Sequence, residues 1–469
     1  MYPVWEGLYV HSAMYVAIIA TFHVLASHLT VAAAWFNLYI ERRAVRENRE
    51  ELYEYLKRSA LGLMVFAYVF GAMAGVGIWQ STTAANPRGI STLIHNFVLY
   101  WGSEWYMFLI DVIGIIAYYY TLGRVSKQTH LRLAWLLALG GSGTLAIIVG
   151  ILSFKLTPGA WLVNGLSLAG FFNPTFWPQV LMRFAFMFVI TSGWSLIIAT
   201  GLPRGFFERE KIIRYAGAIG LIGMVVGLGI WFLWYEPTLP AHARSIMSSR
   251  AIVPITYPLI ITGAVAAVAT LTFSYIKPHL QRRWIALTFM ILLQAAIFGA
   301  ERVREVIRKP DIISGYISSN QLLFADLPAR GVVREEQRLK QTGMLGNLPF
   351  LPPIDQIDVA NVNATEAQRQ IAVGHVLVVQ ECGSCHNVSL QTQIRFLDQH
   401  LVLRSLADLL VLRQRTTATD IDAYIKGIQG FPYMHEMVGT DAERAAMAAY
   451  LEDFIKQTYN NQPTVVGQR

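Results

Sequence analysis

The feature that most constrains this chain is a series of long apolar stretches within its first 301 residues. A helix needs roughly 20 mostly apolar residues to cross the hydrocarbon core of a bilayer. Eight stretches approach or exceed that length, near residues 12–40, 59–80, 97–123, 132–154, 178–201, 212–235, 251–276 and 284–301. We therefore expect an all-α, polytopic membrane helix bundle of about eight spans, followed by a smaller all-α soluble domain.

The charged residues between these stretches indicate which side of the membrane each end faces. The net charge is +8, but the Lys and Arg residues form short clusters between apolar stretches, which is typical of membrane topology and argues against a nucleic-acid partner. The loops after the first, third, fifth and seventh stretches hold 16 of these residues, and the opposite loops hold 4. Because basic loops stay in the cytoplasm, we expect both the N-terminus and the C-terminal part to lie outside a bacterial cytoplasmic (inner) membrane.

Composition divides the chain into three parts. We expect a membrane domain over residues 1–301, a periplasmic surface linker over 302–364 and a soluble domain over 365–469. The linker contains L-P-F-L-P-P-I-D, whose prolines favour an extended chain. The first residues lack the basic segment and small-residue cleavage site of a secretory signal, so we expect the first span to insert with its N-terminus outside.

The soluble part contains both cysteines of the chain, in the motif Cys382-Gly-Ser-Cys385-His386. This is the C-x-x-C-H pattern of covalent haem attachment. Two thiols at this spacing reach the two vinyl groups of one haem, and the adjoining histidine binds the iron. A thioredoxin-like site would need a preceding strand, and a zinc site would need two more ligands at suitable spacing. We therefore expect one covalent haem c, with Cys382 and Cys385 as thioether residues and His386 as an iron ligand.

A second axial ligand is expected further along the chain. The segment I-Q-G-F-P-Y-M-H-E-M-V-G-T supplies Met434, with Met437 and His435 as alternatives. A capping box at Thr440-Asp-Ala-Glu443 then opens another helix. The order of helix, haem motif, distal methionine and C-terminal helix resembles a class I cytochrome c. Haem c attachment takes place outside the cytoplasmic membrane, in agreement with the charge distribution.

Ionisable side chains inside a span cost a few kcal/mol each on insertion scales, so each is a functional candidate. His23 lies near the middle of the first stretch, and it and His28 are candidate ligands of a haem b iron. Glu104 and Asp111 in the third stretch are seven residues apart and share one helix face. They could form part of a proton path, lie next to a haem iron, or form a polar seam that faces another helix. Arg183 suits a haem propionate, because a guanidinium binds a carboxylate bidentately.

Further polar residues lie near the outer ends of the spans. The last stretch ends in Glu301-Arg-Val-Arg-Glu305, whose glutamates are candidate cofactor-binding residues. His11, His95 and His242 lie near the ends of the first, third and sixth stretches. They are weaker candidates for a haem iron, because a loop histidine is more often a solvated surface residue.

Several sequence runs resemble subunit I of the cytochrome bd quinol oxidases over roughly residues 10–315. These runs are F-H-V-L-A-S-H-L-T-V in the first stretch, W-L-L-A-L-G-G-S in the fourth, Asn173-Pro174, and Glu305-Val-Ile-Arg-Lys-Pro310. The resemblance implies an all-helical membrane fold with its N-terminus outside, and a second membrane subunit. It also implies b-type haems, quinol oxidation at the outer face and oxygen reduction within the membrane.

The resemblance assigns roles to some residues of this chain. His23 matches the histidine that ligates a haem iron at the oxygen-reducing centre, and Asp111 matches a glutamate of a proton channel. Glu104 is one position away from a second channel glutamate. Arg308-Lys-Pro310 stands at the position of an R-Q-P motif, and Glu305 matches a glutamate before it.

The departures from that family concern its quinol side. The family's low-spin haem ligands fall near Phe188 and Pro258, and neither residue can bind iron. The outer loop that binds quinol in the family is reduced here to about residues 236–250, and a cytochrome-like domain replaces the ninth span. His28 stands where the family has proline, which is consistent with a rearranged haem site.

These observations predict a membrane-bound b/c-type cytochrome subunit of a respiratory chain. We expect it to transfer electrons between a periplasmic cytochrome c or redox enzyme, through haem c, and one or more membrane haems or quinone. The alternative is a bd-like terminal oxidase subunit that reduces oxygen with electrons supplied through haem c. A third reading, in which the helices only anchor the cytochrome domain, does not explain the ionisable residues in the spans.

Overall fold

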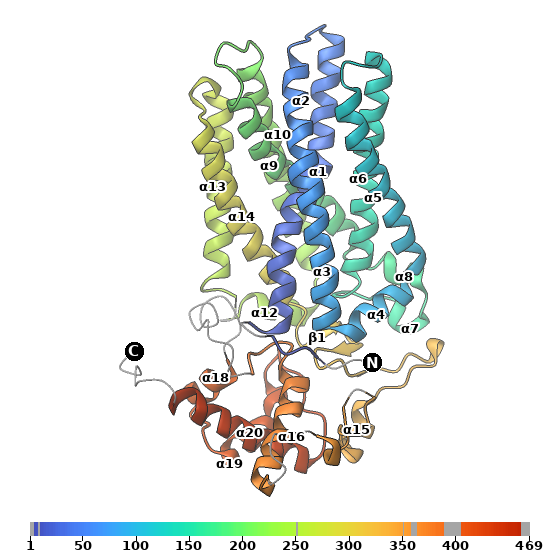
Figure 1. Ribbon diagram of the computed structural model, residues 1–469, viewed down its shortest axis with the longest axis vertical. Coiled ribbons are helices and arrows are strands. Elements are labelled where there is room, and N and C mark those ends of the chain that lie inside the picture. The colour runs from blue at the N-terminus through green and yellow to red at the C-terminus, as the bar shows by residue number, and fades with distance from the viewer. Residues whose placement is uncertain are drawn as a thin grey trace.

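A bundle of long helices lies end to end with a smaller helical domain (Figure 1). The computed structural model describes residues 4–7, 10–249, 252–349, 351–357, 364–388 and 405–460. The bundle comprises α1 (Ser12–Arg46), α2 (Leu52–Gly62), η1 (Leu63–Phe70), α3 (Gly71–Ala85), α4 (Pro87–Asn96), α5 (Val98–Thr121), α6 (Lys127–Ser153), α7 (Trp161–Asn164), α8 (Ser167–Phe171), α9 (Phe176–Thr200), α10 (Arg209–Ile230), η2 (Trp231–Tyr235), α11 (Glu236–Thr238), α12 (Ala241–Met247), α13 (Thr256–Ile276), η3 (Pro278–Leu280) and α14 (Arg283–Val306).

The remaining elements form the connection and the C-terminal domain. They are β1 (Asp311–Ile313), β2 (Ile317–Ser318), η4 (Pro328–Arg330), α15 (Glu336–Thr342), η5 (Ile354–Gln356), α16 (Glu366–Cys382), α18 (Leu406–Leu412), α19 (Ala418–Lys426), η6 (Ile428–Gly430) and α20 (Asp441–Asn460). Among the described residues, the two short antiparallel strands make the one sheet.

Seven helical rods within the described residues are long and apolar enough to cross a membrane. They cover Ser12–Arg46, Leu52–Ala85, Lys127–Ser153, Phe176–Thr200, Arg209–Thr238, Thr256–Ile276 and Arg283–Val306. The span expected near residues 97–123 is α5, which packs against α6. It is not among the seven because its acidic residues, tyrosines and tryptophans lower its mean hydropathy. The all-α polytopic fold predicted from the sequence is confirmed.

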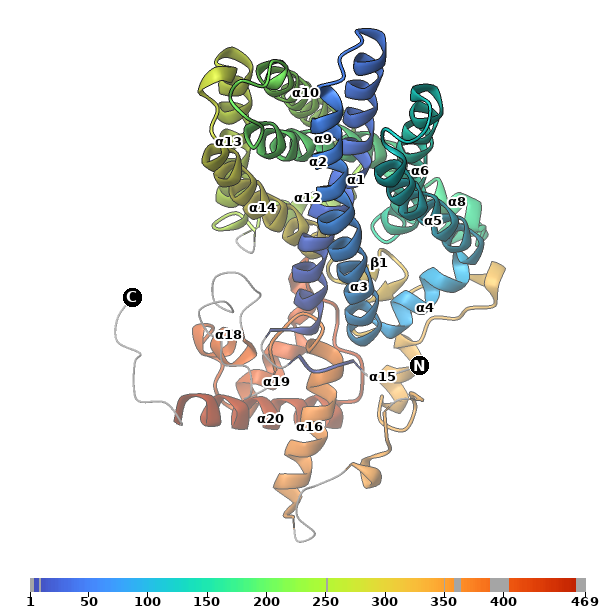
Figure 2. The same ribbon diagram turned by 45° about the horizontal axis from the view of Figure 1, so that its top comes forward.

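Helix α1 is the central element of the bundle. It packs against α3, α6, α9 and α14, and Figure 2 shows it between the α5–α6 pair and the group of α9, α10, α13 and α14. Of its most apolar segment, 56% is buried, against 17% for the α2–α3 rod. The side chains of α1 therefore lie in the interior of the membrane domain.

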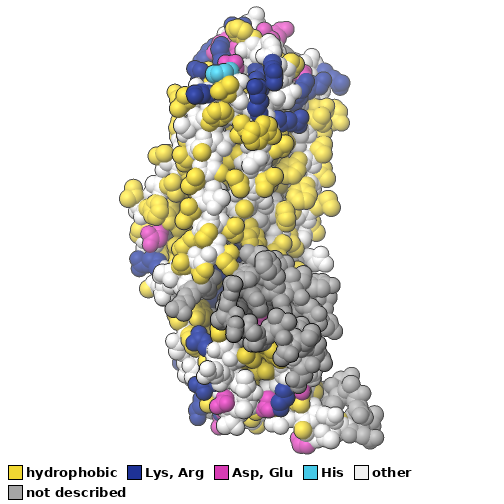
Figure 3. Space-filling model, turned by 90° about the vertical axis from the view of Figure 1, so that its left-hand side faces the viewer, with side chains coloured by type: hydrophobic (Ala, Val, Ile, Leu, Met, Phe, Trp, Pro, Cys, Tyr) yellow, Lys and Arg dark blue, Asp and Glu magenta, His cyan; other side chains and the backbone are white. Residues whose placement is uncertain are grey.

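Basic side chains gather at the end of the bundle that lies away from the C-terminal domain (Figure 3). The other end, where α1 begins, contacts that domain: the Ser12 hydroxyl lies 3.5 Å from the Gly383 carbonyl oxygen, and Glu6 lies 3.4 Å from His375. On the face that Figure 3 shows, apolar side chains cover most of the bundle between the two ends. The loops that the sequence predicts to be cytoplasmic therefore lie at the end of the bundle opposite the C-terminal domain.

The segment expected as an extended surface linker, residues 302–364, is folded over most of its described length. Its first residues complete α14, and the hairpin of β1 and β2 packs on the bundle, where the Tyr316 and Trp161 rings lie 5.0 Å apart. The Arg88 guanidinium binds the Glu335 carboxylate at 2.6 Å. The described part of this segment therefore joins the two domains by specific contacts.

The C-terminal domain is built around the crossing of α16 and α20. The helices approach so closely that a Cβ atom at Gly374 would collide with the Ala446 carbonyl oxygen. The predicted capping box is present: the Thr440 amide donates to the Glu443 carboxylate (2.9 Å), and the Glu443 amide lies 3.3 Å from the Thr440 hydroxyl. Glu443 also accepts from the Met344 amide (2.7 Å), which attaches the preceding segment to this domain.

Candidate functional site

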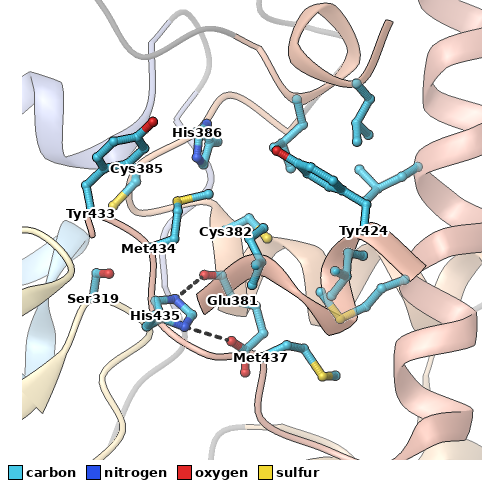
Figure 4. Close-up of a pocket in the computed structure, with 16 residues that line it drawn as sticks. Ser319, Glu381, Cys382, Cys385, His386, Tyr424, Tyr433, Met434, His435 and Met437 are labelled. Carbon is cyan, nitrogen blue, oxygen red and sulfur yellow. Dashed lines mark hydrogen bonds and ion pairs between the residues drawn. The ribbon is translucent and has the colours of Figure 1, made fainter. Parts of the chain in front are cut away.

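The haem-attachment motif lies in a turn directly after α16. Cys382 is the last residue of that helix, and the amides of Cys385 and His386 both donate to its carbonyl oxygen, at 3.1 and 2.9 Å. His386 is 6% exposed. This turn places both cysteines and the imidazole on the wall of one cavity (Figure 4).

The cavity is mostly apolar and encloses about 60 Å³. Its walls are Ser319, Glu381, Cys382, Cys385, His386, Leu406, Leu410, Tyr424, Ile425, Ile428, Tyr433, Met434, His435, Met437, Met447 and Leu451. Aliphatic side chains of α18, α19 and α20 thus face the motif, and this apolar lining suits the faces of a haem ring.

The three proposed distal ligands differ in their hydrogen bonds. His435 Nε2 lies 2.9 Å from the Glu381 carbonyl oxygen, and its Nδ1 lies 3.0 Å from the Glu436 carbonyl oxygen. An imidazole engaged at both nitrogens would have to give up a contact to bind iron. Met434 and Met437 are thioethers that line the same cavity without such a cost. This geometry favours a methionine as the distal ligand.

Among the described residues, no group of three or more His, Cys, Asp and Glu side chains is arranged to hold a metal ion. A haem site does not require such a group, because the macrocycle supplies four ligands and the protein one or two. The residues around the motif fit a haem in this sense: Cys382 and Cys385 would bind it covalently, and His386 and a methionine would bind its iron.

Glu381 is a buried carboxyl group next to the motif. It is 4% exposed and accepts a hydrogen bond from the Asn320 amide at 3.0 Å. Burial raises the pKa of its carboxyl group to about 8, although the hydrogen bond from Asn320 acts in the opposite direction. Figure 4 shows its contacts with His435. Burial also favours the neutral form of His435, and it lowers the pKa of that imidazole.

Replacing Glu381 with glutamine is expected to remove a pH dependence of stability. The pKa of the carboxyl group is 4.5 in its ordinary state and about 8 when folded, so the folded protein holds an extra proton between these values. Stability from this group is complete below about pH 4.5 and falls as the pH rises towards 8, by at most about 1.4 kcal/mol per pH unit.

Thermal unfolding of the full chain, followed by circular dichroism from pH 4.5 to 8.5, measures this slope. Glu381→Gln should flatten it, whereas Glu366→Gln, at an exposed position in the same helix, should not. An unchanged slope in Glu381→Gln would contradict the assignment.

In the membrane domain, His23 has the arrangement of a metal-binding histidine. Its Nδ1 lies 2.9 Å from the carbonyl oxygen of Gly71, directly after the π-helical segment η1. Metal-binding histidines usually direct one ring nitrogen to such an acceptor, which fixes the ring and leaves the other nitrogen for the metal. A Cβ atom at Gly75 would lie only 3.1 Å from His23 Cε1, so this glycine provides space beside the ring.

His28 is arranged differently from His23. It is 9% exposed, and its Nε2 lies 3.3 Å from a terminal nitrogen of Arg183. Its Nδ1 lies 3.3 Å from the Ser27 hydroxyl. Both ring nitrogens of His28 are therefore engaged, so His23 is the better placed of the two predicted ligands.

A cluster of cations lies at the end of the bundle next to the C-terminal domain. We define this cationic cluster as Lys155, Arg183, Arg304, Arg308 and Lys309, together with the carboxylates of Glu301 and Glu305. Arg304 binds Glu301 at 2.6 Å, and Arg308 and Lys309 both pair with Glu305. Burial and the neighbouring Arg308 lower the pKa of Lys155 far below its ordinary value. The cluster thus combines five basic side chains with two carboxylates.

The predicted acidic pair lies along α5. Asp111 is 4% exposed and makes no ion pair with any described residue. A Cβ atom at Gly140 would lie 2.9 Å from Asp111 Oδ1, and one at Gly141 would lie 3.4 Å from Oδ2, so this glycine pair of α6 provides the space that the carboxyl group fills. Glu104 is partly buried two helical turns away, and Tyr68 is close enough to interact with Asp111.

The three outer histidines occupy unlike positions. His95 is exposed, with its Nδ1 2.8 Å from the Ser91 carbonyl oxygen. His242 is partly buried, and its Nε2 makes no hydrogen bond with the described residues. His11 is 3% exposed and lies beside the backbone of Ser384. Burial lowers the pKa of His11 to about 3, so this side chain is a neutral imidazole.

The sequence did not indicate two features of these sites. The sequence indicated only that Lys155 is one of the few basic residues in the outer loops. The fold places it in the cationic cluster. His11 was a weak candidate near a helix end, although the fold places it against the haem-attachment turn. Both features depend on contacts between segments far apart in the sequence, which no local pattern reports.

Comparison with known proteins adds a shared fold. No protein-family model matches the chain, and no curated protein matches it. Among solved structures, the bd oxidase from Geobacillus thermodenitrificans is similar with a TM-score of 0.54 and 17% sequence identity, over 70% of this chain and 91% of that chain. The membrane domain therefore has a bd-oxidase-like fold, in agreement with the resemblance noted from the sequence.

Proposed function

We propose that this chain is a cytochrome subunit of a membrane-bound respiratory complex. In this proposal, it transfers electrons between a redox partner outside the membrane and a haem b within the bundle, through a haem c bound in the C-terminal domain. Haem supplies one-electron redox chemistry when bound. The chain supplies the thiols, the axial ligands and the path between the two sites.

The observation that carries the proposal is the contact between the two candidate sites. His11, at the start of α1, interacts electrostatically with His386 of the haem motif and with Lys309 of the cationic cluster. His435, on the wall of the haem c cavity, interacts with Lys309 and Asp311. The candidate haem c site and the outer end of the membrane domain therefore share a boundary, as electron exchange between them requires.

The cationic cluster supports a haem within the bundle. Buried charges are stable only when they are compensated. Because the pKa of Lys155 is far below its ordinary value, four cations of this cluster face two carboxylates. A ligand with two carboxylates would reduce this excess of positive charge, and a haem carries two propionate carboxylates. Arginine is suited to such groups because its guanidinium binds a carboxylate through two parallel hydrogen bonds.

A second candidate function is oxygen reduction with electrons supplied through haem c. The bd-oxidase-like fold, the orientation of His23 and the buried carboxyl group of Asp111 favour it. In both proposals, the C-terminal domain faces the periplasm of a bacterial inner membrane, a second membrane subunit completes the complex, and quinone is a possible electron carrier.

A pyridine haemochrome spectrum of the purified full chain tests the proposal. We expect both b and c haems, with a b:c ratio of one or more. Adding a reduced soluble cytochrome c should then reduce haem b in the wild-type protein. Haem c without haem b would contradict the proposal, and sustained oxygen uptake driven by the reduced cytochrome would favour the oxidase instead.

A further inference from the structure

A buried acid–base pair joins three helices at the end of the bundle that carries the basic loops. Glu41 of α1 and His130 of α6 are 0% and 2% exposed, and Glu41 Oε1 lies 2.6 Å from His130 Nδ1. The other ring nitrogen of His130 lies 2.8 Å from the Tyr118 carbonyl oxygen of α5. Neither the cytochrome motif nor the cationic cluster involves this pair.

Two tyrosine hydroxyl groups lie near this carboxylate. Glu41 Oε2 is buried without a well-formed hydrogen bond to any described residue. The hydroxyl groups of Tyr118 and Tyr53 are both close enough to interact with Glu41. The buried ion pair therefore lies near two phenolic hydroxyl groups, each of which can carry a proton.

The same face of α5 leads from this pair to the centre of the membrane domain. Tyr118, Asp111 and Glu104 are spaced seven residues apart, so they lie in a row with steps of about 10 Å. The Tyr118 ring lies against the His130 ring, with centroids 4.4 Å apart, and Asp111 lies two helical turns closer to the N-terminus of α5. Tyr68 adds a hydroxyl group beside Asp111.

We propose that Glu41 and His130 form the entrance of a proton path that runs through Tyr118 to Asp111. The inference rests on the proposed function, because reduction of quinone or oxygen inside the membrane consumes protons, and on the expected topology, which places Glu41 near the cytoplasm. Each step breaks one O–H or N–H bond and forms one on the next group, so one proton moves and no group is oxidised. Water molecules complete the steps that side chains do not span.

Hydrogen–deuterium exchange of the Asp111 carboxyl group tests this path without any electron transfer. Infrared spectroscopy of the full chain in lipid would follow the carbonyl band that Asp111→Asn removes, after transfer from H₂O to D₂O. Glu41→Gln keeps the side-chain shape but carries no proton, and Tyr118→Phe lacks the hydroxyl group. We expect each to slow the exchange at least tenfold, and Glu41→Asp to restore it in part.

The matched control is Glu208→Gln. Glu208 is also fully buried at this end of the bundle, where it binds Arg43 at 2.8 Å, but it lies outside the proposed path. Unchanged exchange in Glu41→Gln would overturn the proposal. Equal slowing in Glu208→Gln, or no carbonyl band lost in Asp111→Asn, would overturn it as well. A spectrum without haem b would refute the proposed function and leave the exchange result standing.

Discussion

Replacing both Cys382 and Cys385 with alanine is expected to remove all covalently bound haem from the chain. The two thioether bonds need these thiols, and they are the only cysteines in the sequence. Any haem that remains in the cavity would be held only by its axial ligands and apolar contacts. It would separate from the chain when the protein unfolds.

A haem stain after denaturing electrophoresis measures this effect directly. The wild-type chain should stain, and the double variant should not stain although it reaches the membrane. Ser384→Ala is the matched control, because Ser384 is buried between the two cysteines and its replacement leaves both thiols in place. A stained band in the double variant would refute covalent attachment at this motif.

Replacing His23 with alanine is expected to abolish one haem b signal and leave haem c unchanged. The reason is geometric: the contact with the Gly71 carbonyl oxygen at 2.9 Å fixes the imidazole and leaves Nε2 for iron. A haem b held by His23 would lose this protein ligand in the variant. The reduced-minus-oxidised spectrum of the purified variant should therefore lose b-type absorbance and keep the c-type bands.

Two further histidine variants give this experiment its controls. His95→Ala changes an exposed side chain on α4 and should leave both haem signals intact. His28→Ala removes the partner of Arg183 at 3.3 Å and should alter the haem b band less than His23→Ala does. If haem b survives in His23→Ala and disappears in His28→Ala, the two ligand assignments are reversed.

The sequence predicts the helical bundle well because apolar length is a local property. It predicts the capping box at Thr440 for the same reason, since that box depends on residues within four positions. Helix α5 shows where the criterion weakens: the acidic residues that make it interesting also reduce its apolarity. In the fold, α5 packs along α6 and so belongs to the bundle despite its lower hydropathy.

The sequence does not predict features that depend on distant pairs. Glu41 and His130 are 89 positions apart. The cationic cluster unites the residues after α6, helix α9, and the end of α14 with the residues that follow it. The linker region looked extended because it contains prolines, but Tyr316 packs on Trp161 and Glu335 binds Arg88, both in the membrane domain. Such contacts become visible only when the helices are arranged in space.

The position of α1 against the haem-attachment turn has a consequence for how the protein matures. Ser12 contacts Gly383, and His11 lies beside Ser384, both between the two cysteines. Helix α1 of the membrane domain therefore begins against the turn that carries the motif. In the proposed function, the enzyme that joins haem to the thiols would need access to this turn. We therefore expect attachment to precede the docking of the C-terminal domain.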